Sequence, residues 1–192
     1  MWAVVPIKGF EAPKQRLAEA LSAHERGSLA EHMLHDVLAA LEDLEGILVI
    51  SRDEATLNAA RWSGARVMLE KGDGGYSAAV RQAGEMLASE GVNAMMHVPG
   101  DVPLISRDEV KRIAALPENV PGACVVPSRD FDGTNCLALW PPDLIEPAFG
   151  PDSFHRHCKI LEDLGVKPVV LELEGFALDI DTPDDLQRVA RL

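Results

Sequence analysis

Two aspartates near the C-terminus have a spacing that suits a bound cation. The segment Phe176–Ile180 alternates as a strand would, and residues two apart on a strand point to the same face. Asp179 and Asp181 are therefore expected to point together, and neighbouring carboxylates repel each other unless a cation lies between them. Asp184 and Asp185 are explained as first-turn residues that the helix dipole favours. The pattern predicts that Asp179 and Asp181 share a cation.

A third carboxylate, Asp101, follows an apolar segment that we expect to be a strand, Ala94–Val98. Pro99, Gly100 and Pro103 surround Asp101 and restrict the loop. A carboxylate held rigidly at the carboxyl end of a strand is placed to ligate Mg²⁺, which prefers a few carboxylates together with substrate phosphates. An aspartate that only forms the turn is the alternative.

The loop after the first expected strand is cationic. It holds Lys8, Lys14 and Arg16, and residues 1–20 carry a net charge of +1 in a chain whose net charge is −13. Open α/β sheets bind ligands at the carboxyl ends of their strands, so this loop is predicted to grip a polyphosphate, with Arg16 suited to bidentate contact. A solvated loop is the alternative. The sequence has no G-x-x-x-x-G-K-[ST] motif, which argues against a P-loop mechanism.

Three further turns offer groups that bind anions. The glycine-rich run Gly72–Ser77 allows the backbone to approach a flat or anionic ligand closely. The turns Asp132–Asn135 and Phe149–Phe154 offer hydroxyl and backbone donors, and the second opens a helix, where anions are favoured. Each of the three is also explained as an ordinary turn.

Histidines and cysteines are not expected to form a metal or nucleophilic site. His32 and His35 lie three apart on a long helix with no third ligand nearby, whereas His155 and His157 are two apart on a helix and point in different directions. The odd number of cysteines and the lack of a C-x-x-C pair predict reduced structural thiols of a cytoplasmic protein. These cysteines are Cys124, Cys136 and Cys158.

Short apolar runs alternate with longer amphipathic ones, which predicts an α/β fold with a mixed, mostly parallel sheet flanked by helices, in one domain over residues 1–192. The expected strands are Trp2–Ile7, Gly46–Ile50, Arg66–Leu69, Ala94–Val98, Ala123–Pro127, Asn135–Trp140, Pro168–Leu171 and Phe176–Ile180. The expected helices are Ala23–Leu44, Glu54–Ser63, Ser77–Glu90, Arg107–Leu116, Ser153–Leu164 and Pro183–Leu192. Capping boxes that start at Ser22, Ser51 and Ser106, with a variant at Thr182, support four helix starts.

Composition narrows the class of protein. The 192 residues are 47% apolar, which excludes a disordered chain, and a net charge of −13 argues against a sequence-independent nucleic-acid binder. No apolar stretch approaches the ~20 residues that span a bilayer. The N-terminus lacks a basic leader, so no signal peptide is expected. An acidic cytoplasmic enzyme that contacts neither membrane nor nucleic acid is predicted.

Five motifs occur in one order between residues 4 and 186: P-x-K with K-x-R-L, P-G-D-V-P-L, D-G-T-N, F-G-x-x-S-F-x-x-H and L-D-I-D-T-P-D-D-L. Together they resemble the phospholactate guanylyltransferase family, of the CofC/FbiD type, in the biosynthesis of coenzyme F-420. The resemblance implies a Rossmann-like nucleotidyltransferase fold of the GT-A type. It also implies an enzyme that joins the GMP part of GTP to a three-carbon phosphorylated acid and releases pyrophosphate.

The resemblance implies roles for residues at the matching positions. The implied Mg²⁺ ligands are Asp101, Asp179 and Asp181. The implied acceptor-binding residues are Thr134, Gly150 and Ser153. The implied nucleotide-binding residues are Pro6, Lys8, Lys14, Arg16, Gly75 and Ser77. The expected catalytic residues are Lys14, Arg16 and Asp101. One departure from the pattern matters: where many relatives have G-L-N, this chain has Gly75-Tyr76-Ser77, and the exchange of asparagine for serine changes the hydrogen-bonding groups expected near the base or the acceptor.

Several alternatives stay open. The acceptor is 3-phosphoglycerate, phosphoenolpyruvate or 2-phospholactate, which share a carboxylate and a phosphate; the bacterial members of the family favour the first two. The hypothesis of a nucleotidyltransferase for a pterin or sugar phosphate is less well supported, because the glycine-rich first loop usual in those enzymes is absent from the sequence. A non-catalytic nucleotide-binding partner of a downstream transferase is the alternative of another class. Hand-over of the product to such a transferase, and a homodimer, also stay open.

Overall fold

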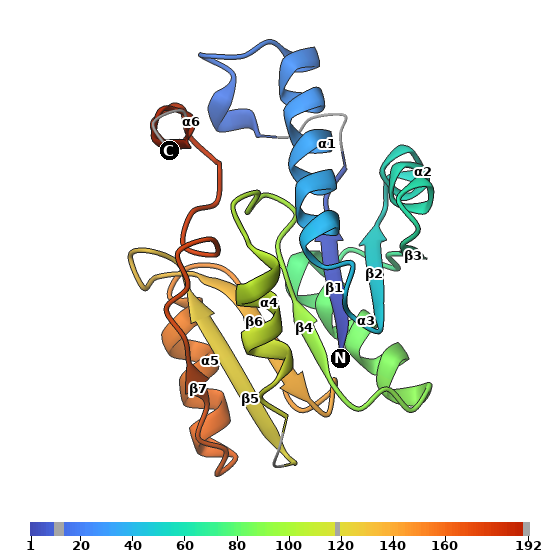
Figure 1. The fold of residues 1–192 in the computed structure, drawn as a ribbon, viewed down its shortest axis with the longest axis vertical. Helices are drawn as coiled ribbons and strands as arrows, with labels where there is room; N and C mark the ends of the chain where they lie inside the picture. The colour runs from blue at the N-terminus through green and yellow to red at the C-terminus, as the bar shows by residue number, and fades with distance from the viewer. Residues whose placement is uncertain (10–13, 118–119, 190–192) are drawn as a thin grey trace.

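A seven-stranded sheet runs through the part of the chain that the structure describes, residues 1–9, 14–117 and 120–189 of a computed structural model (Figure 1). The strands are β1 (Trp2–Ile7), β2 (Gly46–Ser51), β3 (Arg66–Leu69), β4 (Met95–His97), β5 (Gly122–Pro127), β6 (Thr134–Trp140) and β7 (Val169–Val170). Their order in the sheet is β3-β2-β1-β4-β6-β5-β7. Among these strands, β6 is antiparallel to both of its neighbours and the remaining pairs are parallel. This confirms the predicted mixed, mostly parallel α/β fold.

Helices cover both faces of the sheet. They are α1 (Ala23–Ala40), α2 (Glu54–Trp62), α3 (Gly75–Ser89), α4 (Arg107–Ala114), α5 (Ser153–Asp163) and α6 (Pro183–Val189), with a 3₁₀ turn η1 (Gln15–Leu17) before α1. Leu34 of α1, Ala60 of α2 and Ile113 of α4 belong to one buried cluster. Val80 of α3 and Leu161 of α5 belong to the other. The sheet is thus apolar on both faces, and β5 and β6 are buried along their whole length, as expected of strands covered on both sides.

The helix starts show which capping predictions hold. Ser22 and Ser106 form the predicted capping boxes with Glu25 and Glu109. The predicted box at Ser51 is wrong. Ser51 still belongs to β2, and the side chain of Asp53 caps α2 instead, accepting the backbone N–H of Thr56 at 2.9 Å. The N-cap residue directly precedes the first residue of the helix, which is Glu54 here, so Ser51 comes too early in the chain to cap it.

The variant box before α6 is confirmed. The backbone N–H of Thr182 donates to the Asp185 carboxylate at 2.8 Å, and the Asp185 N–H donates back to the threonine hydroxyl at 3.4 Å. This assigns Asp185 to helix capping, as the sequence predicted. The carboxylate is therefore occupied by the turn that leads from the cleft into α6.

The predicted strand Phe176–Ile180 is absent from the described sheet, although its residues are partly buried. The Phe176 carbonyl accepts the side-chain amide of Asn135 at 2.7 Å. The Ile180 N–H donates to the Asp101 carbonyl at 3.0 Å. The backbone groups of this segment are therefore satisfied by a side chain and a loop. Its alternation reflects burial of Phe176 and Ile180 against the core, which a strand and an irregular segment can both achieve.

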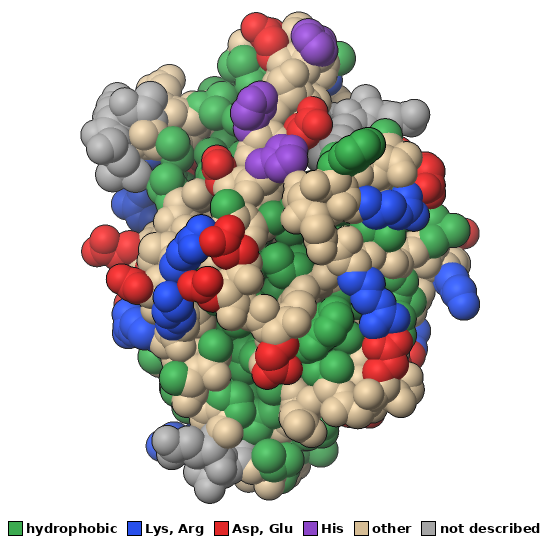
Figure 2. All heavy atoms as spheres, turned by 45° about the vertical axis from the view of Figure 1, so that its right-hand side comes forward, with side chains coloured by type: hydrophobic (Ala, Val, Ile, Leu, Met, Phe, Trp, Pro, Cys, Tyr) green, Lys and Arg blue, Asp and Glu red, His purple; other side chains and the backbone are tan. Residues whose placement is uncertain are grey.

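Several charged side chains on the surface lie in pairs, and Figure 2 shows basic groups next to acidic ones on the face that it displays. Arg66 contacts Glu90 at 2.5 Å, and Lys111 contacts Asp43 at 2.9 Å. Each exposed pair of this kind contributes about 0–1 kcal/mol to stability. Among the described helices, none is both long and apolar enough to cross a membrane.

Two of the three cysteines are buried, as expected of structural thiols. Cys124 lies on β5 and Cys136 on β6, and all three cysteines, including the half-buried Cys158 of α5, are free. Burial raises the pKa of Cys124 to about 12 and that of Cys136 well above its ordinary value. Both thiols therefore stay protonated and unreactive at neutral pH.

Candidate active site

A cleft of about 1140 Å³ lies at the edge of the sheet where the parallel strands end. Residues that follow β1, β2 and β4 line it, together with the first residues of β6 and of α5. Six of the seven strands point their carboxyl ends toward this edge, and β6 starts there because it runs the opposite way. This is the position at which open α/β sheets bind ligands.

The cleft gathers most of the residues that the sequence singled out. Those that line it are Pro6, Lys8, Lys14, Arg16, Asp101, Thr134, Gly150, Ser153, Asp179 and Asp181. Gly75 lines a neighbouring cavity of about 310 Å³, which shares Lys8 and Tyr76 with the cleft. Ser77 lines neither cavity. Its hydroxyl accepts the backbone N–H of Phe149 at 2.9 Å, so Ser77 supports the turn before α5.

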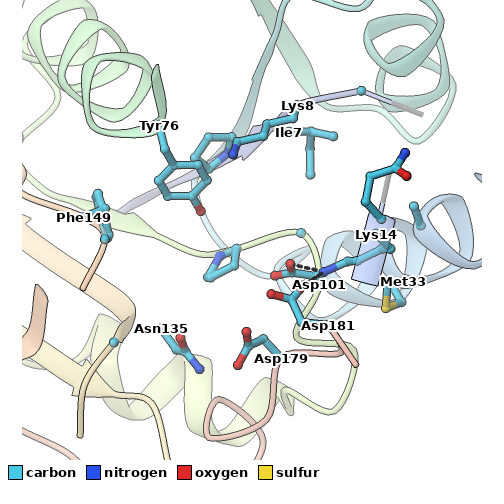
Figure 3. Close-up of a pocket in the computed structure, with 18 of the residues that line it drawn as sticks. Ile7, Lys8, Lys14, Met33, Tyr76, Asp101, Asn135, Phe149, Asp179 and Asp181 are labelled. Carbon is cyan, nitrogen blue, oxygen red and sulfur yellow. Dashed lines mark hydrogen bonds and ion pairs between the residues drawn. The ribbon is translucent and has the colours of Figure 1, made fainter. Parts of the chain in front are cut away.

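Five charged residues of the cleft form what we call the acidic wall: the three carboxylates of Asp101, Asp179 and Asp181, with Lys14 and Arg16 beside them. Figure 3 shows Lys14 next to Asp101 and Asp181, with Asp179 close by. The Lys14 ammonium donates to Asp101 and, at 2.6 Å, to Asp181. The Lys14 side chain is 9% exposed, and the Arg16 guanidinium lies 3.8 Å from Asp181. Burial alone would lower the pKa of Lys14, but the charges of Asp101 and Asp181 outweigh it and the pKa is raised. The sequence predicted a cation shared by Asp179 and Asp181. In the structure the Lys14 ammonium is shared by Asp101 and Asp181 instead.

Asp179 is the half-buried member of the acidic wall that Lys14 does not bridge. Burial raises its pKa, and the neighbouring charge of Asp101 adds to that effect. Figure 3 shows the Asp179 carboxylate between Asn135 and the Asp101–Asp181 pair. Ionised Asp179 is therefore destabilised here unless positive charge comes close, because desolvation and like charge both disfavour the carboxylate form.

The three carboxylates supply the hard oxygen donors that Mg²⁺ prefers. Within the described ranges, however, no three His, Cys, Asp or Glu side chains are arranged closely enough to hold a metal ion. The donor chemistry fits magnesium, while the arrangement has the Lys14 ammonium bound to two of the donors. A magnesium site at Asp101, Asp179 and Asp181 therefore stays a prediction.

Asp101 lies in a loop that packs closely against the end of β1. A side chain at Gly100 would bring its Cβ against the terminal methyl group of Ile7, so a larger residue there would require the Ile7 side chain to shift. The Asp101 carbonyl also accepts the N–H of Ile180, the residue between Asp179 and Asp181. The P-G-D turn therefore positions all three carboxylates of the acidic wall relative to one another.

A second part of the cleft lining, which we call the hydroxyl wall, consists of Thr134, Gly150 and Ser153. Thr134 opens β6 and Ser153 opens α5, and both side chains are buried. Gly150 has a φ of +117°, a conformation that side chains rarely adopt. The backbone N–H of Asp152 donates to the Asp132 carboxylate at 3.1 Å, so the two polar turns predicted separately form one wall.

Two buried histidines lie behind the cleft. The Tyr76 hydroxyl bonds Nε2 of His97 at 2.7 Å, and the Thr134 hydroxyl bonds Nδ1 of His157 at 2.9 Å. The Phe149 ring packs against both imidazoles, with centroids 4.3 and 4.9 Å apart. Burial lowers the pKa of His97 to about 3 and that of His157 to about 4, so both rings are neutral at neutral pH.

Tyr76 is protonated in this setting. Burial, with the charges of Asp101 and Asp179, raises the pKa of Tyr76 well above its ordinary value. Nδ1 of His97 is the one buried side-chain N or O atom in the described residues without a hydrogen-bond partner. Tyr76 therefore presents an uncharged hydroxyl group at the boundary between the cleft and the smaller cavity.

Sequence reasoning missed several residues of the cleft. Arg52 and Asp53 follow β2 and line the cleft, and the rule on carboxyl ends of parallel strands would have found them. Tyr76 lies inside a motif that was considered for its glycines and for the exchange at Ser77, and the sequence analysis gave the tyrosine no role of its own. Met33 reaches the cleft from α1, and no local pattern marks it, because an apolar residue on a helix usually belongs to the core.

Comparison with known proteins gives one consistent family. Residues 1–190 match the family model described as "Guanylyl transferase CofC like". A phosphoenolpyruvate guanylyltransferase from Sphaerobacter thermophilus is 38% identical over 98% of this chain and 91% of its own length. A 2-phospho-L-lactate guanylyltransferase from Methanocaldococcus jannaschii is 31% identical over 98% of this chain and 82% of its own.

A solved structure from Desulfovibrio desulfuricans, assigned to the nucleotide-diphospho-sugar transferases, superposes with a TM-score of 0.82. It covers 99% of this chain and 86% of its own, at 16% sequence identity. At that identity the likeness establishes the fold, which is the nucleotidyltransferase fold that the sequence predicted.

Proposed function

The chain belongs to the family of CofC-like guanylyl transferases, and on that premise we propose that it transfers GMP from GTP to a three-carbon phosphorylated acid, as a step in the biosynthesis of coenzyme F-420. The observation that carries the proposal is the cleft, which is lined both by a set of charged side chains and by buried hydroxyl groups. We favour phosphoenolpyruvate as acceptor, because the relative named for it is 38% identical and the relative named for 2-phospho-L-lactate is 31% identical.

The reaction needs no general base. An oxygen of the acceptor phosphate, already anionic, attacks the α-phosphorus of GTP and forms a new P–O bond. The bond from that phosphorus to the bridging oxygen of the β-phosphate breaks, and pyrophosphate leaves with the electron pair. Catalysis then consists of holding both reactants in line and stabilising charge.

The protein is acidic and nevertheless has to bind two anions, GTP and the acceptor acid. GTP and the acceptor together bring roughly six to seven negative charges, counting −1.5 to −2 for each terminal phosphate. Lys8, Lys14 and Arg16 line the cleft, so they bring positive charge to it within a chain of net charge −13. These side chains would contact the phosphates of GTP, and the hydroxyl wall would hold the acceptor.

Magnesium dependence is part of the proposal. Asp101, Asp179 and Asp181 would hold the ion, because carboxylates are its preferred protein ligands. When bound, Mg²⁺ would offset negative charge on the phosphates of the two substrates. The raised pKa of Asp179 supports this assignment, since a nearby cation would relieve the cost of that charge.

The alternatives are less well supported. A transferase for a pterin or sugar phosphate, or a non-catalytic nucleotide-binding partner, is not favoured, because relatives named as guanylyltransferases cover 98% of the chain. Hand-over of the product to a downstream transferase and formation of a homodimer stay predictions.

The test is an assay of the purified protein with GTP, Mg²⁺ and each acceptor separately, scored by pyrophosphate release. We expect turnover with phosphoenolpyruvate, and none when ATP, CTP or UTP replaces GTP. Removal of Mg²⁺ with a chelator should stop the reaction, and adding Mg²⁺ back should restore it. No pyrophosphate with phosphoenolpyruvate, 3-phosphoglycerate or 2-phospholactate would contradict the proposal.

A further inference from the structure

The last residue of the F-G-x-x-S-F-x-x-H motif, His157, has an interaction at each ring nitrogen. Its side chain is fully buried on α5 beneath the hydroxyl wall. The backbone N–H of Ala148 lies 2.9 Å from Nε2, and a backbone N–H can only donate. Nε2 must therefore be unprotonated, which leaves the proton of the neutral ring on Nδ1.

The position of this proton determines what the Thr134 hydroxyl can do. Nδ1 lies 2.9 Å from the Thr134 oxygen, and with its proton it can only donate to that oxygen. A hydroxyl has a single hydrogen, so the hydrogen of Thr134 stays free for a different acceptor. Thr134 lines the cleft, where an anionic oxygen accepts hydrogen bonds and never donates them.

We propose that His157 is a positioning residue that keeps the Thr134 hydroxyl oriented as a hydrogen-bond donor toward an anionic oxygen of the acceptor acid. This inference rests on the proposed function, in which Thr134 holds that acid. With the opposite tautomer, the hydroxyl would donate to the ring and turn its lone pairs toward the anion. The two tautomers therefore give opposite interactions with the same ligand.

His157 also supports the loop before α5, and this second role has to be separated from the first. Ala148 comes directly before Phe149 and Gly150, so the bond to Nε2 holds the turn that contains another residue of the hydroxyl wall. The two roles use different nitrogens. In H157N the amide nitrogen takes the place of Nδ1 and can donate to Thr134, whereas in H157Q the amide oxygen takes the place of Nε2 and can accept from Ala148.

The test compares these two variants in steady-state kinetics with GTP and phosphoenolpyruvate. A hydrogen bond to a charged group is worth about tenfold or more in binding. We expect H157Q to raise the KM for the acceptor about tenfold or more, H157N to stay within roughly threefold of wild type, and both to keep the KM for GTP. The opposite ranking, with H157Q active and H157N impaired, would overturn the inference in favour of loop support.

A double variant removes the remaining ambiguity. In T134V the hydroxyl is gone and the shape is kept, so H157Q should produce no further increase of the acceptor KM in that background. A further tenfold increase would show that His157 acts on the acceptor without Thr134, which contradicts the inference. Thermal unfolding midpoints of all variants monitor the fold.

A measurement without turnover separates this inference from the proposed function. Long-range ¹⁵N–¹H correlation spectra of the wild-type imidazoles at neutral pH should show His157 with its proton on Nδ1. A proton on Nε2, or on both nitrogens, would overturn the inference whatever the activity, and this also decides the matter if the variants fail to fold. If wild type is inactive with every acceptor while the tautomer is as expected, the proposed function fails and the hydrogen-bond orientation stands.

Discussion

The acidic wall and the hydroxyl wall line one cleft and are built in different ways. The acidic wall comes from segments outside the described strands and α-helices, and a lysine from a loop pairs with two of its three carboxylates, Asp101 and Asp181. The hydroxyl wall comes from the first residues of β6 and α5 and from Gly150 in the turn before α5, and its buried Thr134 hydroxyl is hydrogen-bonded to the neutral imidazole of His157. One wall carries charge that can exchange partners, whereas the other carries fixed dipoles.

This difference matches what the binding of each substrate requires. GTP brings its phosphates and loses two of them, so the groups around it must tolerate a change of charge during turnover. The acceptor has to be held in one orientation so that its phosphate is in line for attack. The predictions below test this division, starting with the largest expected effect.

The largest effect is expected when the negative charge of Asp179 is removed, which is the carboxylate that burial and Asp101 disfavour. Asp179→Asn should lower kcat by at least about a hundredfold, on the order of the loss when one group that stabilises charge in the transition state is removed. Thermal stability should stay the same or rise, because burial and Asp101 destabilise the charged carboxylate of Asp179. Pyrophosphate release and thermal unfolding measure both effects.

The matched control is Asp184→Asn, which removes an exposed carboxylate from the first turn of α6. This variant should keep the wild-type rate. Near wild-type turnover of Asp179→Asn would contradict the role of the acidic wall, and a large loss of stability would contradict the physical account of its raised pKa.

Loss of the lysine should affect one substrate and not the other. Lys14→Ala leaves Asp101 and Asp181 without their shared cation, so the KM for GTP should rise by roughly tenfold or more while the acceptor KM changes little. Stability should fall by about 1–2 kcal/mol, because two partly buried carboxylates lose their partner. Steady-state kinetics and urea unfolding measure these changes, with the exposed Lys111→Ala as control. An equal change in both KM values would break the division between the walls.

Acid should destabilise the protein through the rings behind the hydroxyl wall. Burial lowers the pKa of His97 to about 3 and that of His157 to about 4, below the 6.5 of an exposed histidine. The unfolded chain binds more protons than the native protein below pH 6.5, so stability is complete above that value and falls as the pH drops toward 4 and 3. At about pH 5 the low pKa of each ring should lower the free energy of unfolding by about 2 kcal/mol relative to neutral pH.

Urea unfolding at neutral pH and at about pH 5 measures this loss, which follows from the histidine pKa values. His157→Asn carries no titrating ring and should reduce the loss by about half. His32→Gln, at an exposed position, should leave it unchanged. An identical loss in His157→Asn and wild type would show that the acid sensitivity has another origin.

The smallest expected effect concerns the position that departs from the family pattern. Ser77→Ala removes the hydroxyl that accepts the Phe149 N–H, so stability should fall by about 1 kcal/mol. The acceptor KM should rise a few fold, because the turn that carries Gly150 loosens, while the GTP KM stays the same. A change in the GTP KM alone would place Ser77 with the nucleotide after all, as the sequence implied.

The sequence was informative where local chemistry determines the structure. Capping boxes at Ser22 and Ser106 depend on residues three apart, and the structure forms both. Asp101 was expected in a restricted loop after a strand, and it follows β4 and lines the cleft. This could be predicted because glycine and proline restrict the backbone irrespective of distant contacts. Residues predicted at the ends of different strands meet in one cleft, since parallel strands end at the same edge.

The parts that sequence could not predict depend on distant contacts. Phe176–Ile180 has the alternation of a strand, but Asn135 and the Asp101 loop satisfy its backbone groups, and neither is near in sequence. The tautomer of His157 depends on the backbone of Ala148 and on burial, which no motif displays. The Lys14 contact with Asp181 likewise required the fold, because the spacing had paired Asp181 with Asp179.

The bond between Lys14 and Asp181 joins residues that are 167 positions apart. Synthesis from the N-terminus delivers every described strand by Val170, ahead of Asp179 and Asp181. A nascent chain therefore contains the sheet before it contains the charge pair that completes the cleft. The acidic wall of the cleft is therefore complete only after Asp181 has been synthesised, and a shorter nascent chain would hold Lys14 with Asp101 alone.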